Sequence, residues 1–569
     1  MKKPPLYPIY PIKDLRDLLI QVTDRFGDRV ALRSKKNGVY QSLTYSQLCE
    51  RVTELATAFS ELGLKKRDGV AILSENRTEW AVTYLAAVTS GLVAVPIDKD
   101  LTDREICHIL NFSKPRVLIC SKEYVDRLQE YRKTLPSLER LISMEEETKE
   151  ADLSFSDALK TGREALLAGS QSVQEVELSG EDLAIILFTS GTTGSSKAVM
   201  LTHGNIAANV MATSQHISIG GGVLLSVLPL HHTYECMGGF LLALYQGCTV
   251  CHAESLRRIP ENLQETGATV MLGVPLLFEK LYRRIESGIK EKGEGKFRLA
   301  KGIAAVSQRL FRWNIRRRLF KPIHDKFGGQ LRLFISGGAA VNPRVAKGLR
   351  ELGFDFIQGY GMSEASPIIA VNRVNCFKDA SVGLPLPGLE VKIVDQEILV
   401  RGPSVMTGYY LNEAATRESL KEGWLHTGDF GYFDEDGFLY INGRKKSVIV
   451  TPNGKNVYPE EVEALLNESP YILESLVWGG PEKDPSQVEV QAIVVPRTET
   501  FDEELGPSNY DQAKVHEVIG KEVKKQCKDL ARYKRVKKFR LRSEEFNKTT
   551  TRKIKRYLYT AKSHAADPS

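Results

Sequence analysis

Residues 189–203 have the composition of a phosphate-binding loop. They read TSGTTGSSKAVMLTH and follow the apolar segment Leu183–Phe188, which is typical of a buried strand. Glycines let backbone N–H groups approach anionic oxygens, hydroxyls add donors, and Lys197 adds positive charge. A polar surface turn is the simpler alternative, but one turn does not need so many hydroxyl residues. A Walker-type loop is excluded because two serines separate Gly194 from Lys197 and Ala198 replaces the Mg²⁺-binding hydroxyl.

The same loop resembles the phosphate-binding signature of the adenylate-forming enzymes, the superfamily of acyl-CoA synthetases, luciferases and peptide-synthetase adenylation domains. The usual pattern has proline and glycine where this chain has Ser196 and Ala198. The resemblance implies that the loop binds the triphosphate of ATP. It assigns this role to Thr189, Ser190, Gly191, Thr192, Thr193, Gly194 and Lys197.

Two further segments end in glycines, where exposed backbone could bind a flat base. Residues 331–342, LRLFISGGAAVN, and residues 355–367, DFIQGYGMSEASP, each begin as an apolar strand. Tyr360 could stack on a base, and Glu364 could hold Mg²⁺ between phosphates. The second segment resembles the family's adenine and metal motif, with serine for the usual threonine. The resemblance assigns nucleotide binding to Gly338, Ala339, Gly359, Tyr360, Gly361 and Ser363, and metal binding to Thr189 and the catalytic residue Glu364.

The most specific match to the family is GWLHTGDFGYFDEDGFLYINGRKKSVIVTPNGKNVYPEEVE, residues 423–463. Surface Asp and Arg residues are ordinarily only solvated, so the surrounding motif is what singles out two of them. The resemblance implies that Asp429 accepts both ribose hydroxyls and that Arg444 lies beside it. Lys446 falls at the family's hinge position. Residues 454–463 resemble the long-chain and bacterial fatty acid members in particular.

Two adjacent histidines follow an apolar segment in VLLSVLPLHHTYECMGGFLLALYQG, residues 223–247. A glycine-rich apolar setting suits a pocket wall, although any one histidine is more commonly structural. His232 matches the family histidine that lines the carboxylate pocket, and the resemblance makes it a catalytic residue. His231 is interpreted as structural.

The last candidate lies in FNKTTTRKIKRY, residues 546–557. The family ends with a catalytic lysine in a threonine-containing loop, and Lys553 matches it. Asn547 and Arg552 replace the usual proline and glycine, and in so basic a region any lysine could be a bystander. Because Ile554 and Arg556 keep the register, we select Lys553.

Length and composition are ordinary for a globular protein of more than one domain: 569 residues, 42% hydrophobic and 26% charged. No apolar run approaches the roughly 18–20 residues of a membrane span. The amino terminus, MKKPPLYPIYPIKDL, lacks the apolar core of a signal peptide. Eight scattered cysteines argue against a disulfide framework. These features predict a cytoplasmic protein, or one held peripherally at a membrane surface.

Positive charge is concentrated in two segments. Residues 510–556 contain 17 Lys and Arg against six Asp and Glu, while the whole chain carries only +7, which predicts an anionic partner for this region. Residues 296–321 contain nine Lys and Arg and no acid, and their apolar residues recur at helical spacing. This pattern predicts an amphipathic basic helix whose apolar stripe faces either the core or a lipid surface. We identify no nucleic-acid recognition module.

The pattern near the amino terminus predicts a parallel α/β layer. Leu48, Val52, Leu55 and Ala58 fall at helical spacing, and Val70–Leu73 and Leu92–Ile97 are typical of buried strands. Residues 143–181 are weakly periodic and are interpreted as a surface excursion. The resemblance, which spans about residues 40–557, implies a large multi-layer α/β amino-terminal domain (1–443) and a smaller, mobile α+β carboxy-terminal domain (444–569) with a hinge near Lys446.

The expected activity is ATP-dependent activation of a long-chain fatty acid through an acyl-adenylate, followed by thioester formation. The cofactors implied are ATP, Mg²⁺ and coenzyme A. Two alternatives remain: an acyl carrier protein as the thiol acceptor, and a non-catalytic, nucleotide-dependent protein at the membrane surface.

Overall fold

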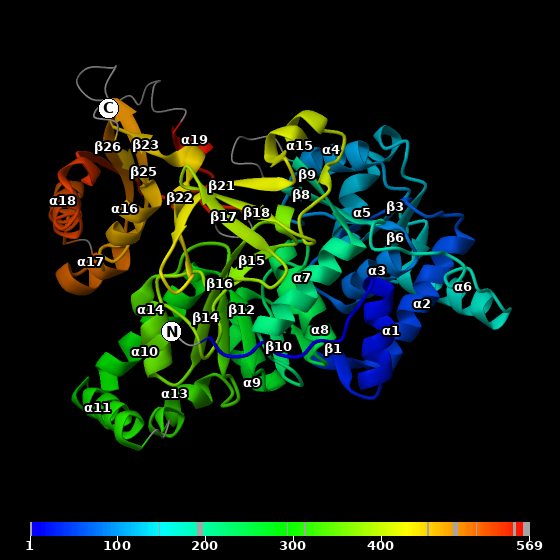
Figure 1. Cartoon of the computed structure of the whole chain (residues 1–569), viewed down its shortest axis with the longest axis horizontal. Coiled ribbons are helices and arrows are strands. Elements are labelled where there is room, and N and C mark those ends of the chain that lie inside the picture. The colour runs from blue at the N-terminus through cyan, green and yellow to red at the C-terminus, as the bar shows by residue number, and fades with distance from the viewer. Residues whose placement is uncertain are drawn as a thin grey trace.

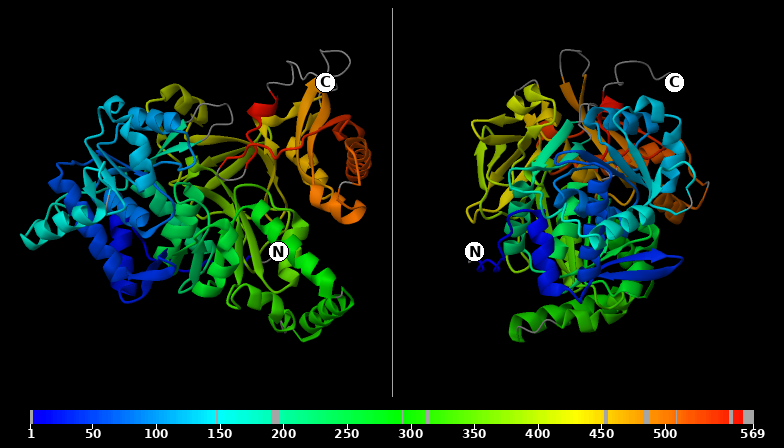
Figure 2. Two further views of the ribbon diagram at one scale, coloured as in Figure 1. Left: turned by 180° about the vertical axis from the view of Figure 1, so that it is seen from behind. Right: turned by 90° about the vertical axis from the view of Figure 1, so that its right-hand side faces the viewer.

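A large amino-terminal part and a smaller carboxy-terminal part make up the chain (Figures 1 and 2). The computed structural model describes residues 3–560, apart from 147, 190–196, 293, 312–314, 452–454, 482–487, 508 and 550–552. The large part contains three sheets with their helices, and the small part packs at one end of it. This architecture confirms the predicted α/β class with a large and a smaller domain.

The first sheet has eight strands in the spatial order β19-β9-β8-β4-β3-β5-β6-β7. Their bounds are β3 (Gly69–Leu73), β4 (Val93–Pro96), β5 (Val117–Cys120), β6 (Arg140–Ser143), β7 (Leu153–Ser154), β8 (Leu183–Thr189), β9 (Lys197–Thr202) and β19 (Gly408–Tyr409). The helices of this region are α1 (Leu15–Phe26), α2 (Tyr45–Glu61), α3 (Thr78–Thr89), α4 (Asp103–Ser113), α5 (Lys122–Gln129) and α6 (Phe155–Leu167). β3 pairs parallel with β4 and β5, as the alternation of strand and helix predicts.

The second sheet has nine strands in the order β16-β15-β14-β13-β12-β10-β11-β1-β2. Their bounds are β1 (Val30–Lys36), β2 (Val39–Thr44), β10 (Val223–Ser226), β11 (Thr249–His252), β12 (Val270–Gly273), β13 (Leu333–Ser336), β14 (Asp355–Gly361), β15 (Ile368–Val371) and β16 (Leu384–Pro385). Its helices are α7 (His203–His216), the π-helix η2 (Tyr234–Leu241), α8 (Leu242–Tyr245), α9 (Ile259–Thr266), α10 (Pro275–Lys292), α11 (Glu294–Phe311), α12 (Arg316–Leu319), α13 (Lys321–Lys326) and α14 (Pro343–Glu351). The strands from β1 through β11, β10, β12 and β13 to β14 are parallel.

One continuous hydrophobic core joins the two large sheets. Strands of both sheets contribute to it together with α2, α3, α7 and η2. Helix α3 is buried on almost all its faces, which explains its apolar composition. Helix α2 begins at a capping box formed by Thr44 and Gln47 and buries the predicted stripe that includes Leu48, Val52 and Leu55.

The third sheet leads into the carboxy-terminal part. It contains β17 (Glu390–Val394), β18 (Glu397–Arg401), β20 (Leu420–Lys421), β21 (Trp424–Phe433) and β22 (Leu439–Arg444), with α15 (Glu413–Ser419) beside it. The small part contains β23 (Ile449–Val450), β24 (Asn456–Val457), α16 (Pro459–Leu466), β25 (Ile472–Pro481), β26 (Val488–Pro496), α17 (Thr498–Leu505), α18 (Gln512–Gln526), β27 (Lys538–Leu541) and α19 (Tyr557–Thr560). A separate apolar cluster around β25, β26 and α18 forms its own core.

Two expectations from sequence differ from the structure. The segment 143–181 lies largely at the surface, as interpreted, but it is more regular than its weak periodicity suggests, because it contains α6, which begins at a capping box of Ser154 and Asp157. Helix α6 packs on α2 so closely that a Cβ on Gly162 would lie 1.7 Å from the backbone oxygen of Glu54. The weak periodicity of α6 reflects a helix that buries only a narrow face.

The basic segment 296–321 is not one helix either. Helix α11 ends at Phe311, and the short α12 follows. After α11, Arg317 of α12 donates to the backbone oxygens of Leu331 and Gly329, at 2.7 and 3.0 Å, and Phe320 is buried. These contacts direct the chain back toward β13.

None of the described helices is long and apolar enough to cross a membrane. Each of the eight cysteines is a free thiol, and Cys248 and Cys251 are buried at and beside β11.

Candidate functional site

The carboxylate of Asp429 occupies the nucleotide end of the candidate site. β21 and β22 pair antiparallel with Asp429 opposite Arg444, and the Arg444 Nε lies 2.8 Å from Asp429 Oδ1. The Tyr360 hydroxyl, from β14 of the second sheet, donates to Oδ2 at 2.7 Å. The Asp429 backbone N–H donates to the Thr427 hydroxyl at 3.1 Å, which fixes the local turn. Since each carboxylate oxygen has further lone pairs, Asp429 can also accept hydrogen bonds from two ribose hydroxyls.

Glycines leave the backbone without side chains at the strand ends beside Tyr360. Gly338 has a φ of +85° and lies exposed with Ala339 just beyond β13. Gly361 follows Tyr360 at a point where a Cβ would lie 1.9 Å from the backbone oxygen of Pro367, so no larger residue fits. β13 and β14 are parallel neighbours, and the candidate base-binding residues therefore meet at one sheet edge.

Tyr409 brings the metal and phosphate candidates together. Glu364 follows β14 in the 3₁₀ turn η4 (Ser363–Ala365), and its Oε1 accepts from the Tyr409 hydroxyl at 2.9 Å. The Lys197 Nζ lies 4.5 Å from the centroid of the same ring. Lys197 begins β9 opposite Thr189, whose hydroxyl donates to the Lys197 backbone oxygen at 3.3 Å. The donor set of Glu364 and Thr189 fits Mg²⁺, which prefers oxygen ligands. The predicted residues Ser190, Gly191, Thr192, Thr193 and Gly194 lie outside the described residues.

His232 lies on the loop between β10 and η2. Burial lowers the pKa of its imidazole, and the neighbouring His231 and Lys553 lower it further. The ring is therefore neutral at pH 7. The next side chain, Thr233, shares a hydrogen bond of 3.1 Å with Ser363, which connects this loop to the turn that carries Glu364.

Asn76 fixes the loop that carries His232. Its Nδ2 donates to the Leu228 backbone oxygen at 2.6 Å and to the Ser226 hydroxyl at 3.2 Å, and its Oδ1 accepts from the Leu230 backbone N–H at 2.9 Å. Three hydrogen bonds from one amide thus hold residues 226–230 against the end of β3. The Asn76 side chain thus acts on His232 by fixing the loop that precedes it.

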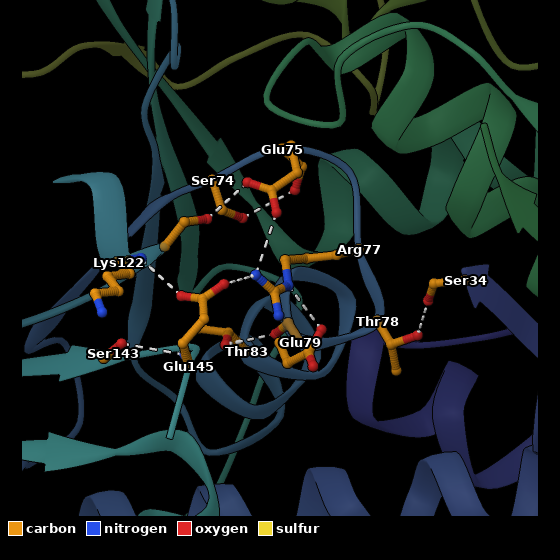
Figure 3. A network of polar contacts seen from close by, with 11 residues as sticks. Ser34, Ser74, Glu75, Arg77, Thr78, Glu79, Thr83, Lys122, Ser143 and Glu145 are labelled. Atoms are coloured by element: carbon orange, nitrogen blue, oxygen red, sulfur yellow. Dashed lines mark hydrogen bonds and ion pairs between the residues drawn. The ribbon is translucent and has the colours of Figure 1, made fainter. Parts of the chain in front are cut away.

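The turn that presents Asn76 is held by an ionic network around Arg77 (Figure 3). Arg77 donates to Glu79 at 2.9 Å and pairs with Glu145 from the end of β6, and Glu145 in turn accepts from the Lys122 backbone N–H at 2.6 Å. These contacts raise the pKa of Arg77 against the effect of its burial. The network connects the ends of β3, β5 and β6, so the turn carrying Asn76 has little freedom.

Lys553 is presented by a narrow loop of the carboxy-terminal part. Lys548 and Ile554 form an antiparallel bridge, and the Thr549 backbone N–H donates to the Lys553 backbone oxygen at 2.8 Å. Arg556, just beyond the loop, pairs with Glu463 of α16. The base of the loop is therefore fixed to its own domain.

The Lys553 amine reaches the site on the larger part. The surrounding protein lowers the pKa of this amine, although the residue keeps contact with solvent; Arg444 lowers it further, and Asp429 opposes the change. Lys553 also lowers the pKa of His232. Lys553 thus shares its electrostatic environment with His232 and with Arg444 and Asp429. Lys446 lies farther back, exposed in the 3₁₀ turn η5 (Lys445–Ser447) between β22 and β23.

Sequence reasoning missed Asn76 and Tyr409. Both follow recognisable signals: Asn76 lies in SENRTEW, residues 74–80, a polar turn directly after a buried strand, and Tyr409 lies in the aromatic pair of GYY, residues 408–410. Polar residues at the carboxyl end of a parallel strand commonly line a ligand site, and this rule could have indicated Asn76.

Glu235 is a fully buried acid in η2, three residues after His232. Burial raises the pKa of its carboxyl to about 8, an effect that the polar groups of Ser226 and Leu228 only partly offset. The folded state thus keeps a proton that the unfolded chain releases near pH 4.5. Stability from this group is fully present below pH 4.5 and declines by about 1.4 kcal/mol per pH unit until the folded pKa is passed.

Glu235→Gln is expected to remove this pH dependence, because the amide is neutral in both states. Chemical denaturation from pH 5 to pH 8 measures the free energy of unfolding of both proteins. The two curves should diverge as the pH rises, with the variant the more stable near pH 8. Parallel curves over this range would show that the Glu235 carboxyl is not protonated in the folded protein.

The fold combines a large α/β part, whose strand ends carry the candidate site, with a smaller carboxy-terminal part that carries Lys553. A family model described as "AMP-binding enzyme" matches residues 20–410, and the chain belongs to this family.

Relatives within the family are named as fatty acid ligases. The long-chain-fatty-acid–CoA ligase FadD15 of Mycobacterium bovis (strain ATCC BAA-935 / AF2122/97) is 30% identical over 482 residues, covering 79% of this chain and 78% of that protein. The chloroplastic long-chain-fatty-acid–[acyl-carrier-protein] ligase AEE15 of Arabidopsis thaliana is 27% identical over 565 residues, covering 85% and 76%. The crystal structure of the anthranilate CoA ligase AuaEII with anthranoyl-AMP has a TM-score of 0.76 at 21% identity, covering 99% of this chain and 98% of that one, and so shares the fold.

Proposed function

We infer that this chain is an AMP-forming ligase that joins a long-chain fatty acid to coenzyme A through an acyl-adenylate. The observation that carries this inference is the meeting of three groups at one site: the Asp429–Arg444–Tyr360 cluster, the neutral imidazole of His232 and the amine of Lys553. Membership of the AMP-binding family and similarity to ligases named for long-chain fatty acids support the substrate class.

In the first step a carboxylate oxygen attacks the α-phosphorus of ATP, and the bond to pyrophosphate breaks. Asp429 and Arg444 hold the ribose, Tyr360 and its neighbouring glycines hold the adenine, and Lys197 holds the triphosphate. Lys553 lies between the carboxylate and the α-phosphate, where its charge offsets their repulsion. Mg²⁺ held by Glu364 and Thr189 would supply further neutralisation of phosphate charge.

In the second step the thiol sulfur attacks the acyl carbon, and AMP leaves. Lys553 has no role once the adenylate is made, and the thiol needs a path to the acyl carbon. We therefore propose that the small domain, residues 444–569, rotates relative to residues 1–443 about Lys446. The exposed position of Lys446 in η5 supports this pivot, because few packed contacts have to break there.

Coenzyme A is the proposed acceptor because its phosphates complement the basic residues of 510–556. An acyl carrier protein, which presents an acidic surface, is the alternative, and AEE15 is named for that acceptor. Incubation with palmitate, ATP and Mg²⁺ and either coenzyme A or holo-carrier protein distinguishes the two. If thioester formed only on the carrier protein, the carrier protein and not coenzyme A would be the acceptor.

We predict that palmitate is preferred over acetate and benzoate. Each buried methylene contributes roughly 0.8 kcal/mol, so even six additional ones inside the protein contribute ~4–5 kcal/mol. Side-by-side kcat/KM values for the three acids measure this preference. A preference for acetate or for the aryl acid would contradict the long-chain assignment.

We also propose that α11 contacts an anionic membrane surface from which the fatty acid is taken. Leu299 and Ile303, one turn apart on this helix, are 66% and 46% exposed, and the segment 296–321 carries nine basic residues and no acid. Helix α11 forms an outer edge of the molecule, below α10 and α13 (Figures 1 and 2). Apolar side chains flanked by basic ones are what an interfacial helix requires.

Leu299→Glu/Ile303→Glu is expected to abolish flotation of the full chain with vesicles containing phosphatidylglycerol. Leu167→Glu is the matched control, since Leu167 is 83% exposed on α6, at the far side of the molecule from α11 (Figure 1). Neutral phosphatidylcholine vesicles should bind neither the parent nor the double variant. Equal flotation of the double variant and the parent would exclude α11 as the contact.

A further inference from the structure

Asp98, His231 and His232 form a compact cluster that the proposed reaction does not use as a unit. One ligand atom from each residue lies within 4.8 Å of the other two. Asp98 follows β4 of the first sheet, whereas both histidines follow β10 of the second. The cluster therefore forms where the carboxyl ends of the two large sheets meet. We propose that these three side chains bind a divalent transition-metal ion of the zinc class.

The geometry of the cluster suits such an ion. The His231 Nε2 lies 3.4 Å from Asp98 Oδ1, close to the separation of about 3.4 Å between two ligands of a tetrahedral zinc with bonds near 2.0–2.1 Å. The two imidazole rings lie 4.4 Å apart between centroids and are tilted by 47°, so the histidines are close neighbours without stacking face to face. The Asp100 backbone N–H donates to Asp98 Oδ1 at 2.9 Å and orients the carboxylate.

The His231 nitrogen is the second sign of a ligand. The side chain is only 5% exposed, and its Nε2 faces the Asp98 carboxylate at 3.4 Å without a hydrogen bond of good geometry. A buried imidazole nitrogen and a carboxylate oxygen at this separation can both bind one ion placed between them. Two imidazoles and one carboxylate form a common donor set for Zn²⁺ and a poor one for Mg²⁺, which prefers oxygen ligands. The metal proposed here is thus distinct from the Mg²⁺ that accompanies ATP.

Occupancy of this site has a consequence for the reaction. This step rests on the proposed function, which places the fatty acid carboxylate beside His232. A metal on His232 would occupy that space, and Zn²⁺ should therefore inhibit adenylation in competition with the fatty acid.

Titration of the full, chelator-treated chain with Co²⁺ tests the site directly. The expected result is a single equivalent bound, with the intense visible bands of four-coordinate Co²⁺, and displacement by Zn²⁺ but not by millimolar Mg²⁺. Asp98→Asn and His231→Asn should each weaken binding at least about tenfold.

The matched control is His426→Asn. His426 is also a histidine beside a carboxylate, 3.5 Å from Glu397, but it lacks a second imidazole, and this variant should bind Co²⁺ like the parent. Thermal melts establish that each variant is folded. The isosteric Asp98→Asn keeps the test decisive if His231→Asn does not fold.

Three results would overturn the site: no saturable Co²⁺ binding, binding that survives both Asp98→Asn and His231→Asn, or a thiolate charge-transfer band that assigns the metal to cysteine. The inhibition is measured separately, as pyrophosphate release at varied palmitate and fixed Zn²⁺. Binding that requires Asp98 and His231, without competition against palmitate, would leave the metal site standing and refute only the placement of the fatty acid carboxylate beside His232.

Discussion

Lys553→Ala is expected to lower the rate of acyl-adenylate formation by about 10²–10³-fold while leaving thioester formation from supplied acyl-AMP near the parent rate. The carboxylate and the triphosphate repel each other during the first step, and the Lys553 amine is placed to offset that charge. The second step begins from an adenylate already made. Single-turnover assays of each half-reaction measure the two rates.

Two companion variants make this test specific. Lys555→Ala removes a neighbouring charge, but the hydrogen bond from Lys555 to Asn547 is made by the backbone and persists, so both half-reactions should be unaffected. Lys446→Pro should show the reverse of Lys553→Ala, because proline fixes φ at the proposed pivot and hinders rotation. Two results would argue against two domain arrangements. One is an equal loss of both half-reactions in Lys553→Ala, and the other is no loss of either half-reaction in Lys446→Pro.

Asp429→Ala should raise the KM for ATP by about 10–100-fold in adenylation. The ribose loses an acceptor whose charge-assisted hydrogen bonds contribute roughly 1.5–3 kcal/mol, and Arg444 and Tyr360 lose their shared partner. Steady-state pyrophosphate release at varied ATP measures this effect. Asp436→Asn is the control: Asp436 also pairs with a cation, Lys378 at 2.6 Å, but has no contact with Tyr360 or Arg444. Unchanged KM in Asp429→Ala would place the nucleotide elsewhere.

Helices and strands were predictable where the local pattern of apolar residues alone determines the element. Helix α2 buries the stripe that its sequence displays, and β3 and β4 lie within a residue or so of their predicted bounds. The break between α11 and α12 was not predictable, because the basic and apolar pattern of 296–321 continues across it. Tertiary contacts of Arg317 and the burial of Phe320 end the helix there, and neither contact is visible in local sequence.

Sequence identified those residues of the candidate site that match a family motif. Asp429 and Arg444 meet across neighbouring strands, and Lys553 reaches them from the other part of the chain, as the motifs imply. Their roles remain predictions. The family motifs did not include Asn76 or Tyr409, whose side chains connect segments far apart in sequence, although the position of Asn76 after a buried strand was an available signal. Glu235 is similar, since its raised pKa depends on burial that composition does not display.

Pyrophosphate release with palmitate, ATP and Mg²⁺ before and after addition of coenzyme A tests the central claim most directly. Without a thiol, we expect a burst of pyrophosphate equal to the enzyme present and a tightly held palmitoyl-AMP. Added coenzyme A should then convert this species to palmitoyl-CoA and AMP in equal amounts and restore turnover. Absence of pyrophosphate release with palmitate and with any other carboxylate would contradict the ligase assignment and favour a non-catalytic nucleotide-binding protein.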